Sequence, residues 1–457
     1  MDPILNQFGY NKFREGQKEV ITSLEEGHDA IAILPTGNGK SFIYQYIGVK
    51  EKCRVVIVSP LIALMVDQVA SLKQLGIHRA VAITSLMTEA EKNYILSTLN
   101  EYQFIFVSPE MLQAPRFFKQ LSKLEIGLLV VDEAHCISQW GYDFSSDYLF
   151  IGKMRKSLKN PRTLALTATA TPQVIHDIYT FLGLDKNKTT YFQGHAFLKN
   201  REIDVISVEG LRSKMLSELL KRVDFPCIVY AATIKEIEGL KEALLGEGFT
   251  KIDTFHSKRH SSDRQTIQQK FFRGEVNILL ATSAFGMGIN QSNIRTIIHY
   301  QLPQTLEDYV QQIGRAGRDL QFSRCIAFVH PDDFSQMSRK IERSYEVEDV
   351  EETELHQNIK EIAEAFHWNN EQKNEFIKMQ RGRKLKQLRQ IEEFATTSQC
   401  KEQYLAQFFG ENRKEPCGKC SSCRHLDLFL LEITSKWNEE ESSQKSFEES
   451  FKKLFNL

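Results

Sequence analysis

The chain has 457 residues, of which 42% are hydrophobic and 26% are charged, an ordinary balance for a globular protein. Its formal net charge of −1 excludes a protein that coats nucleic acid through bulk positive charge, but not one with local basic surfaces. No apolar run approaches the roughly 18 residues that cross a membrane, and the N-terminus lacks a signal-peptide pattern. We therefore expect a cytoplasmic protein of two or three domains with no membrane partner.

Short apolar runs alternate with helical patterns from about residue 28 to residue 190, which predicts β-α-β units and a parallel sheet. The strands expected there are Ala30–Leu34, Val55–Ser59, Phe104–Ser108, Leu128–Val131 and Thr163–Thr167. The same rhythm restarts after residue 203, with expected strands at Cys227–Tyr230, Ile252–Phe255, Asn277–Ala281, Thr296–Tyr300 and Arg324–Val329. The pattern predicts two α/β domains in tandem, joined near residues 195–205.

The first expected strand leads into Leu34–Ser41, LPTGNGKS, which has the pattern of a phosphate-binding loop. Glycines in such a loop let backbone N–H groups approach the phosphates, while its lysine supplies a charge and its serine a hydroxyl for Mg²⁺. The expected nucleotide contacts are Thr36, Gly37, Asn38, Gly39, Lys40 and Ser41. The strict pattern has glycine at the position of Leu34, so the loop taken alone leaves a chance glycine-rich turn open.

An acid pair, Asp132-Glu133, follows the expected strand Leu128–Val131. Open α/β sheets bind ligands at the carboxyl ends of their strands. There one carboxylate can hold Mg²⁺ while the other orients or deprotonates the attacking water. A lone Asp-Glu pair more often caps a helix. Together with the upstream loop, however, the pair predicts a nucleoside triphosphatase.

The second domain has no phosphate loop and instead carries QQIGRAGRD, from Gln311 to Asp319. Arg315 and Arg318 are three residues apart, so we expect them on one face of a helix. An arginine that reaches a γ-phosphate held by the first domain would couple hydrolysis to domain closure, and such a finger is worth about 10³–10⁵ in rate. The alternative is a surface helix with structural salt bridges.

The eight cysteines fall into two groups. Those at 53, 136, 227 and 325 are scattered through mostly apolar segments, as reduced core thiols are. The others, Cys400, Cys417, Cys420 and Cys423, lie within 24 residues at spacings that suit tetrahedral Zn²⁺. With four protein ligands no position remains for water, so we expect a structural metal.

In order and spacing, these motifs resemble those of the RecQ helicases, superfamily 2 DNA motors, over about residues 5–425. Leu34–Ser41 and Asp132–His135 resemble motifs I and II, Thr167–Thr169 resembles motif III, Ser283–Asn290 motif V and Gln311–Arg318 motif VI. The resemblance implies two tandem RecA-like parallel-sheet domains followed by a small helical zinc-binding module.

The resemblance also implies roles for individual residues. It assigns Lys40 and Ser41 to phosphate and Mg²⁺, Asp132 to the metal, Glu133 to water activation and Arg318 to the finger. Arg315 and Gln311 would lie close to the nucleotide. The segment from Phe8 to Gln17 resembles the adenine-reading segment of the family, in which Gln17 would bond the base edge while Tyr10 and Arg14 pack around the base.

Two features of the resemblance concern DNA. Cys136–Phe144 is similar to the aromatic-rich loop of the family, and a base stacked on Trp140 or Phe144 would report DNA binding to the hydrolytic site. The alternative is that Trp140 fills the interdomain cleft. Tyr142 replaces a common histidine, and Ser145-Ser146-Asp147 stands where Arg-Pro-Glu is usual. The basic stretch with Lys378, Arg381 and Arg383 is expected to touch DNA phosphates, or else to be a solvated helix face.

The expected division is 1–203 and 204–334 for the two domains, 335–425 for the zinc module and 426–457 for an amphipathic, charged tail. The winged helix and further helical domain of longer relatives are expected to be absent. The expected function is an ATP-, Mg²⁺- and Zn²⁺-dependent DNA helicase, moving 3′ to 5′ on single-stranded DNA and unwinding partly duplex DNA in repair and recombination. The alternatives are an RNA-directed relative, or an ATP-switched DNA-binding or annealing module.

Overall fold

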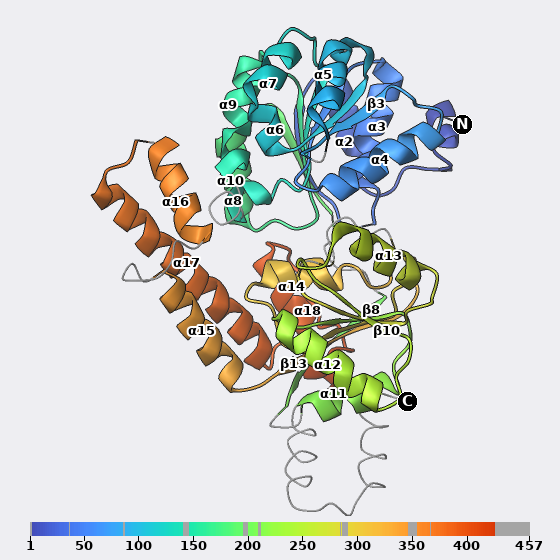
Figure 1. The fold of residues 1–457 in the computed structure, drawn as a ribbon, viewed down its shortest axis with the longest axis vertical. Helices are drawn as coiled ribbons and strands as arrows, with labels where there is room; N and C mark the ends of the chain where they lie inside the picture. The colour runs from blue at the N-terminus through green and yellow to red at the C-terminus, as the bar shows by residue number, and fades with distance from the viewer. Residues whose placement is uncertain are drawn as a thin grey trace, which may run out of the picture. The chain divides into compact units, whose positions relative to one another are not determined.

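The computed structural model describes residues 2–425 except 36, 86, 140–145, 195–199, 209–211, 284, 286–290, 346–353 and 366. Thr36, Trp140, Tyr142, Phe144, most of Ser283–Asn290 and the tail 426–457 lie outside the described residues. The chain forms two compact units (Figure 1). Unit 1 comprises residues 1–196, 287–289 and 349–373, and unit 2 comprises 197–286, 290–348 and 374–457.

Unit 1 is built on a seven-stranded parallel sheet in the order β3-β4-β2-β5-β6-β1-β7. Its strands are β1 Asp29–Ile33, β2 Val55–Val58, β3 Ala80–Ile83, β4 Phe104–Val107, β5 Leu128–Val131, β6 Thr163–Thr167 and β7 Thr189–Gln193. Every residue of β2 to β6 is buried, because helices cover both faces of the sheet.

The helices of unit 1 form two apolar cores, one on each face of the sheet. One core is made with α1 Pro3–Gln7, α2 Gln17–Glu25, α3 Lys40–Glu51 and α4 Ile62–Gln74. The other is made with α5 Glu89–Ser97, α6 Pro109–Gln113, α7 Pro115–Leu121, α8 Cys136–Gln139, α9 Ile151–Ser157, α10 Pro172–Leu182 and the 3₁₀ turns η1 Leu99–Glu101 and η2 Ser146–Phe150. Helix α16, Glu354–Ala365, also belongs to this unit.

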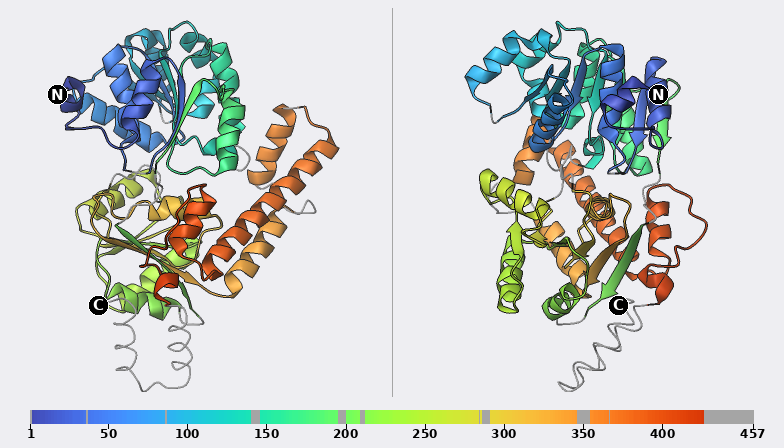
Figure 2. Two further views of the ribbon diagram at one scale, coloured as in Figure 1. Left: turned by 180° about the vertical axis from the view of Figure 1, so that it is seen from behind. Right: turned by 90° about the vertical axis from the view of Figure 1, so that its right-hand side faces the viewer.

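Unit 2 is built on a six-stranded parallel sheet in the order β10-β11-β9-β12-β13-β8. Its strands are β8 Arg201–Ser207, β9 Cys227–Tyr230, β10 Ile252–Phe255, β11 Ile278–Ala281, β12 Thr296–His299 and β13 Ser323–Val329. Its helices are α11 Arg212–Leu220, α12 Ile234–Gly246, α13 Ser261–Phe272, α14 Leu306–Ile313, α15 Asp332–Ser344, α18 Lys401–Phe408 and α19 Ser421–Arg424. Helix α17, Asn370–Thr396, belongs to unit 2 from residue 374 onward and runs beside α15 (Figure 2).

The predicted fold class is confirmed: two parallel sheets follow one another in the chain, and a helical region with four clustered cysteines comes after them. Each predicted strand is present, with ends that differ by at most one residue. Strands β3, β7 and β8 were not predicted. No helix among the described residues is long and apolar enough to cross a membrane.

Candidate nucleotide-binding site and metal centre

The phosphate loop and the acid pair lie at the same edge of the unit 1 sheet. Strand β6 lies between β1 and β5, and all three are parallel, so the segments that follow them are neighbours. The backbone N–H of Leu34 donates to the carbonyl of Thr167 at 2.9 Å, and that of Ala134 donates to Leu166 at 2.8 Å. These bonds tie the loop after β1 and the loop after β5 to the end of β6.

The phosphate loop turns through two glycines in the left-handed region of backbone space. Gly37 has φ +88° and Gly39 has φ +73°, conformations that side chains disfavour. A Cβ on Gly39 would also lie 2.7 Å from Nε2 of Gln17. Lys40 begins helix α3, and its Nζ donates to the carbonyl of Leu34 at 3.4 Å. The N-terminus of α3 therefore lies next to a cation, an arrangement suited to phosphate.

Of the three residues predicted to surround adenine, Gln17 and Arg14 contact this loop, and Tyr10 lies beside Arg14. Gln17 is 3% exposed, and its Nε2 donates to the carbonyls of Asn38 at 3.0 Å and Gly39 at 3.1 Å. Its Oε1 accepts the N–H of Arg14 at 2.8 Å. The Arg14 guanidinium donates to the carbonyl of Gly37 and lies 6.0 Å from the centre of the Tyr10 ring. Gln17 and Arg14 thus fix the shape of the phosphate loop.

In the acid pair, Asp132 is buried and Glu133 is half-buried with a strained backbone. Burial, and then the charge of Glu133, raises the pKa of Asp132 to about 7, while the charge of Lys40 opposes that rise. Glu133 has φ +47°, a conformation that costs about 1–3 kcal/mol for a residue other than glycine and that marks functional sites. A divalent cation here would restore the ionised form of Asp132, so the donor set fits Mg²⁺.

Hydrogen bonds connect the acids to neighbouring segments. Nδ1 of His135 lies 2.9 Å from the Thr167 hydroxyl, which in turn donates to the carbonyl of Thr169 at 3.0 Å. The buried Tyr148 donates its hydroxyl to the carbonyl of Asp132 at 3.1 Å. Tyr148 lies in η2, just beyond the aromatic loop, so the acid pair is fixed by segments on both sides of it.

Sequence reasoning missed two tyrosines at this site, Tyr148 and Tyr44. Burial, followed by the charge of Asp132, raises the pKa of the Tyr44 phenol, and a hydrogen bond with Ser41 opposes that rise. Tyr44 stands three residues after Ser41 on α3, a spacing that places two side chains on one helix face. That spacing was the available signal for Tyr44, whereas no local pattern identifies Tyr148.

The prediction that Arg315 and Arg318 share a helix face is wrong. Helix α14 ends at Ile313, and both arginines lie in the turn that follows, where Gly317 has φ +60°. Arg315 is 4% exposed and makes a hydrogen bond to the Tyr230 side chain. Arg318 is half-buried, and its Nε donates to the carbonyl of Gly314 at 3.3 Å. The partly exposed Arg318 is thus the better placed of the two to meet a ligand.

Gln311 lies on the last turn of α14 and is half-buried. Its neighbour Gln312 is buried and approaches Nε2 of His299 at 2.8 Å. Burial lowers the pKa of His299 to about 4, so this histidine is neutral. Gln311 is therefore the glutamine of this pair that remains accessible at the helix surface.

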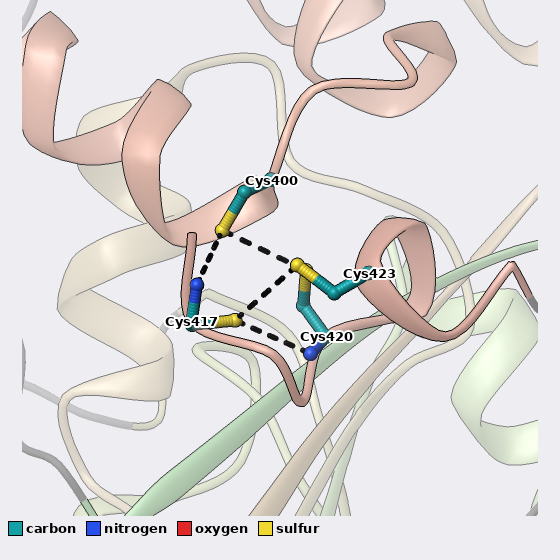
Figure 3. A group of neighbouring side chains, drawn as sticks. All are labelled: Cys400, Cys417, Cys420 and Cys423. Carbon is teal, nitrogen blue, oxygen red and sulfur yellow. Dashed lines mark hydrogen bonds between the residues drawn. The ribbon is translucent and has the colours of Figure 1, made fainter. Parts of the chain in front are cut away.

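The four clustered cysteines form a metal centre (Figure 3). Their Sγ atoms all lie within 4.8 Å of one another, with Cys417 and Cys423 at 4.0 Å and Cys400 and Cys420 at 3.9 Å. Tetrahedral zinc with bonds of about 2.3 Å requires sulfur atoms about 3.8 Å apart. Backbone N–H groups donate to three of the sulfurs: Cys417 to Cys400 at 3.2 Å, Lys401 to Cys420 at 3.4 Å and Cys420 to Cys417 at 3.3 Å. These bonds favour thiolates, so the cysteines fit zinc.

The zinc-binding turn covers the edge of the unit 2 sheet. Strand β8 is the edge strand, and the hydroxyl of Ser421 accepts the N–H of Val205 at 3.0 Å. One nitrogen of Arg424 contacts both oxygens of Asp204, at 2.7 and 2.8 Å, and Glu202 at 2.8 Å. Because Ser421 and Arg424 flank ligands of the cluster, the metal centre and the edge strand form one structural unit.

A buried lysine connects the metal centre to α17. Lys401 is 0% exposed, and its Nζ donates to the carbonyls of Phe394, Ala395 and Thr397 at 2.8, 3.0 and 2.9 Å. The Phe394 ring packs 5.2 Å from that of Tyr309 on α14. On α17, Lys378 and Arg381 are exposed and Arg383 is half-buried. The predicted DNA contacts thus lie on a helix that the zinc module anchors.

Replacing Arg424 with alanine is expected to destabilise unit 2 by about 3–5 kcal/mol, because the buried Asp204 loses its cation. Burial already raises the pKa of Asp204 to about 7, and Arg424 opposes that rise. In the unfolded chain the pKa of an aspartate is about 3.9. Between about pH 4 and pH 7, Asp204 therefore binds a proton more strongly in the folded state. Its contribution to the free energy of unfolding falls as pH rises through that window. The decrease in the free energy of unfolding caused by Arg424→Ala should therefore be larger at about pH 8 than at about pH 6.

Urea unfolding of zinc-loaded protein at the two pH values measures this effect. The double variant Arg424→Ala/Asp204→Asn is expected to recover most of the stability, because a neutral amide needs no counter-ion. A double variant no more stable than Arg424→Ala would show that the Asp204 charge is not the cause.

Two parallel sheets in tandem, with a glycine loop beside an acid pair, are typical of nucleotide-dependent helicases. Three family models match: DEAD/DEAH box helicase over residues 14–178, helicase conserved C-terminal domain over 211–319 and RecQ zinc-binding over 331–424. The chain belongs to the RecQ family of ATP-dependent DNA helicases. No winged-helix domain is found among the three matches or among the described residues.

Two relatives and one solved structure show the extent of the likeness. The probable ATP-dependent DNA helicase RecS of Bacillus subtilis (strain 168) is 39% identical over 340 residues, which cover 73% of this chain and 68% of the relative. The ATP-dependent DNA helicase RecQ of the same organism is 34% identical over 425 residues, 92% of this chain and 66% of the relative. The chain therefore spans about two thirds of their length. The DUF1998 helicase MrfA bound to DNA shares the fold, with a TM-score of 0.61, 16% identity and coverage of 75% of this chain and 50% of that one.

Proposed function

We propose that this chain hydrolyses ATP to move 3′ to 5′ along single-stranded DNA and to unwind duplex DNA, in repair and recombination. The acid pair beside the glycine loop, with Asp132 buried and Glu133 strained, carries the proposal, since that arrangement suits phosphoryl transfer. Family membership supports DNA as the polymer. Polarity and pathway rest on the family alone, and a DNA substrate favours a cytoplasmic location, with the nucleoid in a bacterium.

Unit 1 supplies the proposed binding and hydrolysis of ATP. Backbone N–H groups of residues 36–39 and the Lys40 side chain bind the phosphates, with Ser41 and Asp132 as ligands for Mg²⁺. Magnesium, when bound, neutralises the β- and γ-oxygens. Glu133 orients the attacking water and takes its proton. Tyr10, Arg14 and Gln17 bind adenine in this proposal, and Gln17 would exchange an amide bond to the phosphate loop for one to the base edge.

Unit 2 supplies the proposed arginine finger. Arg318 stabilises charge on the γ-phosphate in the transition state, and Arg315 and Gln311 shape the nucleotide environment beside it. Arg318 is the partly exposed member of the pair, whereas Arg315 is committed to Tyr230. The finger and the acid pair belong to different units, so the proposal requires residues of both units for hydrolysis.

DNA contacts are proposed for the aromatic loop and for α17. Trp140 and Phe144 stack on bases and report DNA binding to Asp132-Glu133, with Tyr148 fixing the exit of that loop. Lys378, Arg381 and Arg383 bind phosphates without reading sequence. The proposed functional division remains 1–203, 204–334, 335–425 and 426–457.

A strand-displacement assay tests the function directly. We expect ATP-dependent release of the shorter strand from a duplex with a 3′ single-stranded overhang, and little release from one with a 5′ overhang. Equal release from both would overturn the polarity. ATP-dependent annealing of complementary strands without any displacement would favour the alternative, an ATP-switched binding or annealing module.

A second comparison separates DNA from RNA. Single-stranded DNA and RNA of the same sequence and length are each titrated against the rate of ATP hydrolysis. Stronger stimulation by DNA is expected from family membership. Equal or stronger stimulation by RNA would favour an RNA-directed motor of the same class.

A further inference from the structure

The segment that carries Arg315 and Arg318 is a loop, residues 314–319, which we call the arginine loop. On one side, the lead-in to β12 holds it. The N–H of Gly317 donates to the carbonyl of Ile294 at 2.9 Å, and that of Asp319 donates to Ser292 at 3.1 Å. These backbone bonds fix one edge of the loop against the sheet.

Two side chains at the start of β8 hold the other edge. Arg201 donates from Nε to the carbonyl of Ala316 at 2.8 Å and from a terminal nitrogen to Gly314 at 3.1 Å. Asn200 donates from Nδ2 to the carbonyls of Gly317 at 2.8 Å and Gln321 at 2.6 Å. The arginine loop therefore receives side-chain hydrogen bonds on three of its carbonyl groups.

The burial of Arg201 shows that this contact is specific. Its residue is 4% exposed, and among the described residues no carboxylate forms an ion pair with it. A buried guanidinium without an acid is costly unless its hydrogen bonds are satisfied, and here loop carbonyls satisfy them. Asn200 adds a steric restraint, because a Cβ on Gly317 would lie 2.4 Å from Asn200 Nδ2.

The position of these residues in the chain is also informative. Unit 1 ends at Ala196 in its main segment, and Asn200 and Arg201 come shortly after it, at the start of the unit 2 sheet. The first described residues of unit 2 in the chain therefore contact the arginine loop. Helix α14 stops at Ile313, so the carbonyls of Gly314 and Ala316 are bonded to Arg201 instead of continuing the helix.

We propose that Arg201, assisted by Asn200, is a positioning residue for ATP hydrolysis: it fixes the arginine loop so that Arg318 is presented in one geometry to the nucleotide. This inference rests on the proposed role of Arg318. Arg201 touches neither nucleotide nor metal; it acts through the loop. Loss of its two bonds removes two of the side-chain hydrogen bonds on that edge and leaves the Asn200 bond to Gly317, so the base of Arg318 is held less tightly.

The test replaces Arg201 with glutamine and follows two readouts in the full chain. Backbone hydrogen exchange over residues 311–319 is expected to become faster, while exchange over β9 and β12 stays as in the unaltered protein. The kcat of DNA-stimulated ATP hydrolysis is expected to fall about 10–100-fold, with KM for ATP changed less than about threefold, because a misplaced group lowers the rate more than it weakens ground-state binding.

Three further variants guard against a merely structural effect. Arg222→Gln removes a half-buried arginine of the same unit that pairs with Glu218, and it is expected to leave both readouts unchanged. Arg201→Lys should recover only part of the rate, since an ammonium group lacks the planar fork that spans two carbonyls. Asn200→Ala keeps Arg201, so it should fold even if Arg201→Gln does not, and it is expected to show the same two changes at smaller size.

The outcomes separate this inference from the proposed function. Unchanged exchange over 311–319 in Arg201→Gln and Asn200→Ala would overturn the inference. Faster exchange with unchanged kcat would also overturn it, and Arg318→Ala then shows where the fault lies. If Arg318→Ala hydrolyses ATP slowly, the proposed finger role of Arg318 stands and only the positioning role of Arg201 is rejected. If Arg318→Ala is fully active, the finger role is rejected as well.

Discussion

Replacement of Lys40 with alanine is expected to abolish DNA-stimulated ATP hydrolysis, with a loss of at least about 100-fold. Lys40 supplies the charge at the start of α3, beside the two left-handed glycines of the phosphate loop. Its charge also lowers the pKa of Asp132, against burial and Glu133, which raise it. The variant therefore loses a phosphate contact and, in addition, leaves less of Asp132 ionised for Mg²⁺.

The measurement is kcat at saturating single-stranded DNA, together with DNA affinity and thermal stability. Alanine is a good helix former at the first position of α3, so folding and DNA binding are expected to be retained. Lys73→Ala, an exposed lysine on α4, is the matched control and should be fully active. Turnover of Lys40→Ala near that of the control would remove Lys40 from the chemistry.

Replacement of Cys420 with serine is expected to release zinc and unfold the metal centre. Structural zinc contributes about 10–16 kcal/mol in small zinc-binding peptides, comparable to the about 5–15 kcal/mol that stabilises a whole domain. Ser421 and Arg424 would then leave β8, so the N–H of Val205 would lose its acceptor and the sheet edge would open. The damage is expected to reach beyond the module into the unit 2 sheet.

Metal analysis of the purified chain gives the first readout, about one zinc per unaltered chain and about none in Cys420→Ser. Hydrogen exchange at Val205 gives the second and should become faster in the variant. Cys53→Ser, which changes a half-buried cysteine far along the chain from the cluster, should keep both the metal and the protection. A zinc-free chain with an intact, protected β8 would contradict the structural role of the metal.

The sequence predicted the elements whose signals are local. The phosphate loop and the acid pair each follow a short apolar strand, and parallel strands bring such segments to one edge without further information. The four cysteines needed only their spacing, and their sulfur atoms converge as expected. In each case the chemistry lies within a few residues of the element that positions it.

Strand β8 was not predicted because its stabilising partners are remote in the chain. Its sequence, REIDVIS, carries Arg201, Glu202 and Asp204 at positions that are buried. Charged residues argue against a buried strand unless they are paired. The partner of Asp204 is Arg424, 220 residues away in the chain. The partners of Arg201 are carbonyls of the arginine loop, and no local sequence pattern identifies either contact.

The helix prediction for Arg315 and Arg318 failed for a related reason. A spacing of three fits a helix face, but the left-handed Gly317 turns the chain, and Arg201 takes the carbonyls of Gly314 and Ala316 that a longer helix would use. In place of the predicted helix, the structure has a loop whose carbonyl groups are bonded to Arg201. Arg315 is buried in this loop, and the partly exposed Arg318 remains the candidate finger.

A single-turnover measurement of ATP hydrolysis by Arg318→Ala, at saturating DNA, tests most directly whether both units complete one catalytic site. We expect the chemical rate to fall about 10³-fold or more, while the dissociation constant of a non-hydrolysable ATP analogue stays within about threefold, because the finger acts on transition-state charge. A chemical rate equal to that of the unaltered chain would contradict the proposal that the second sheet contributes to hydrolysis.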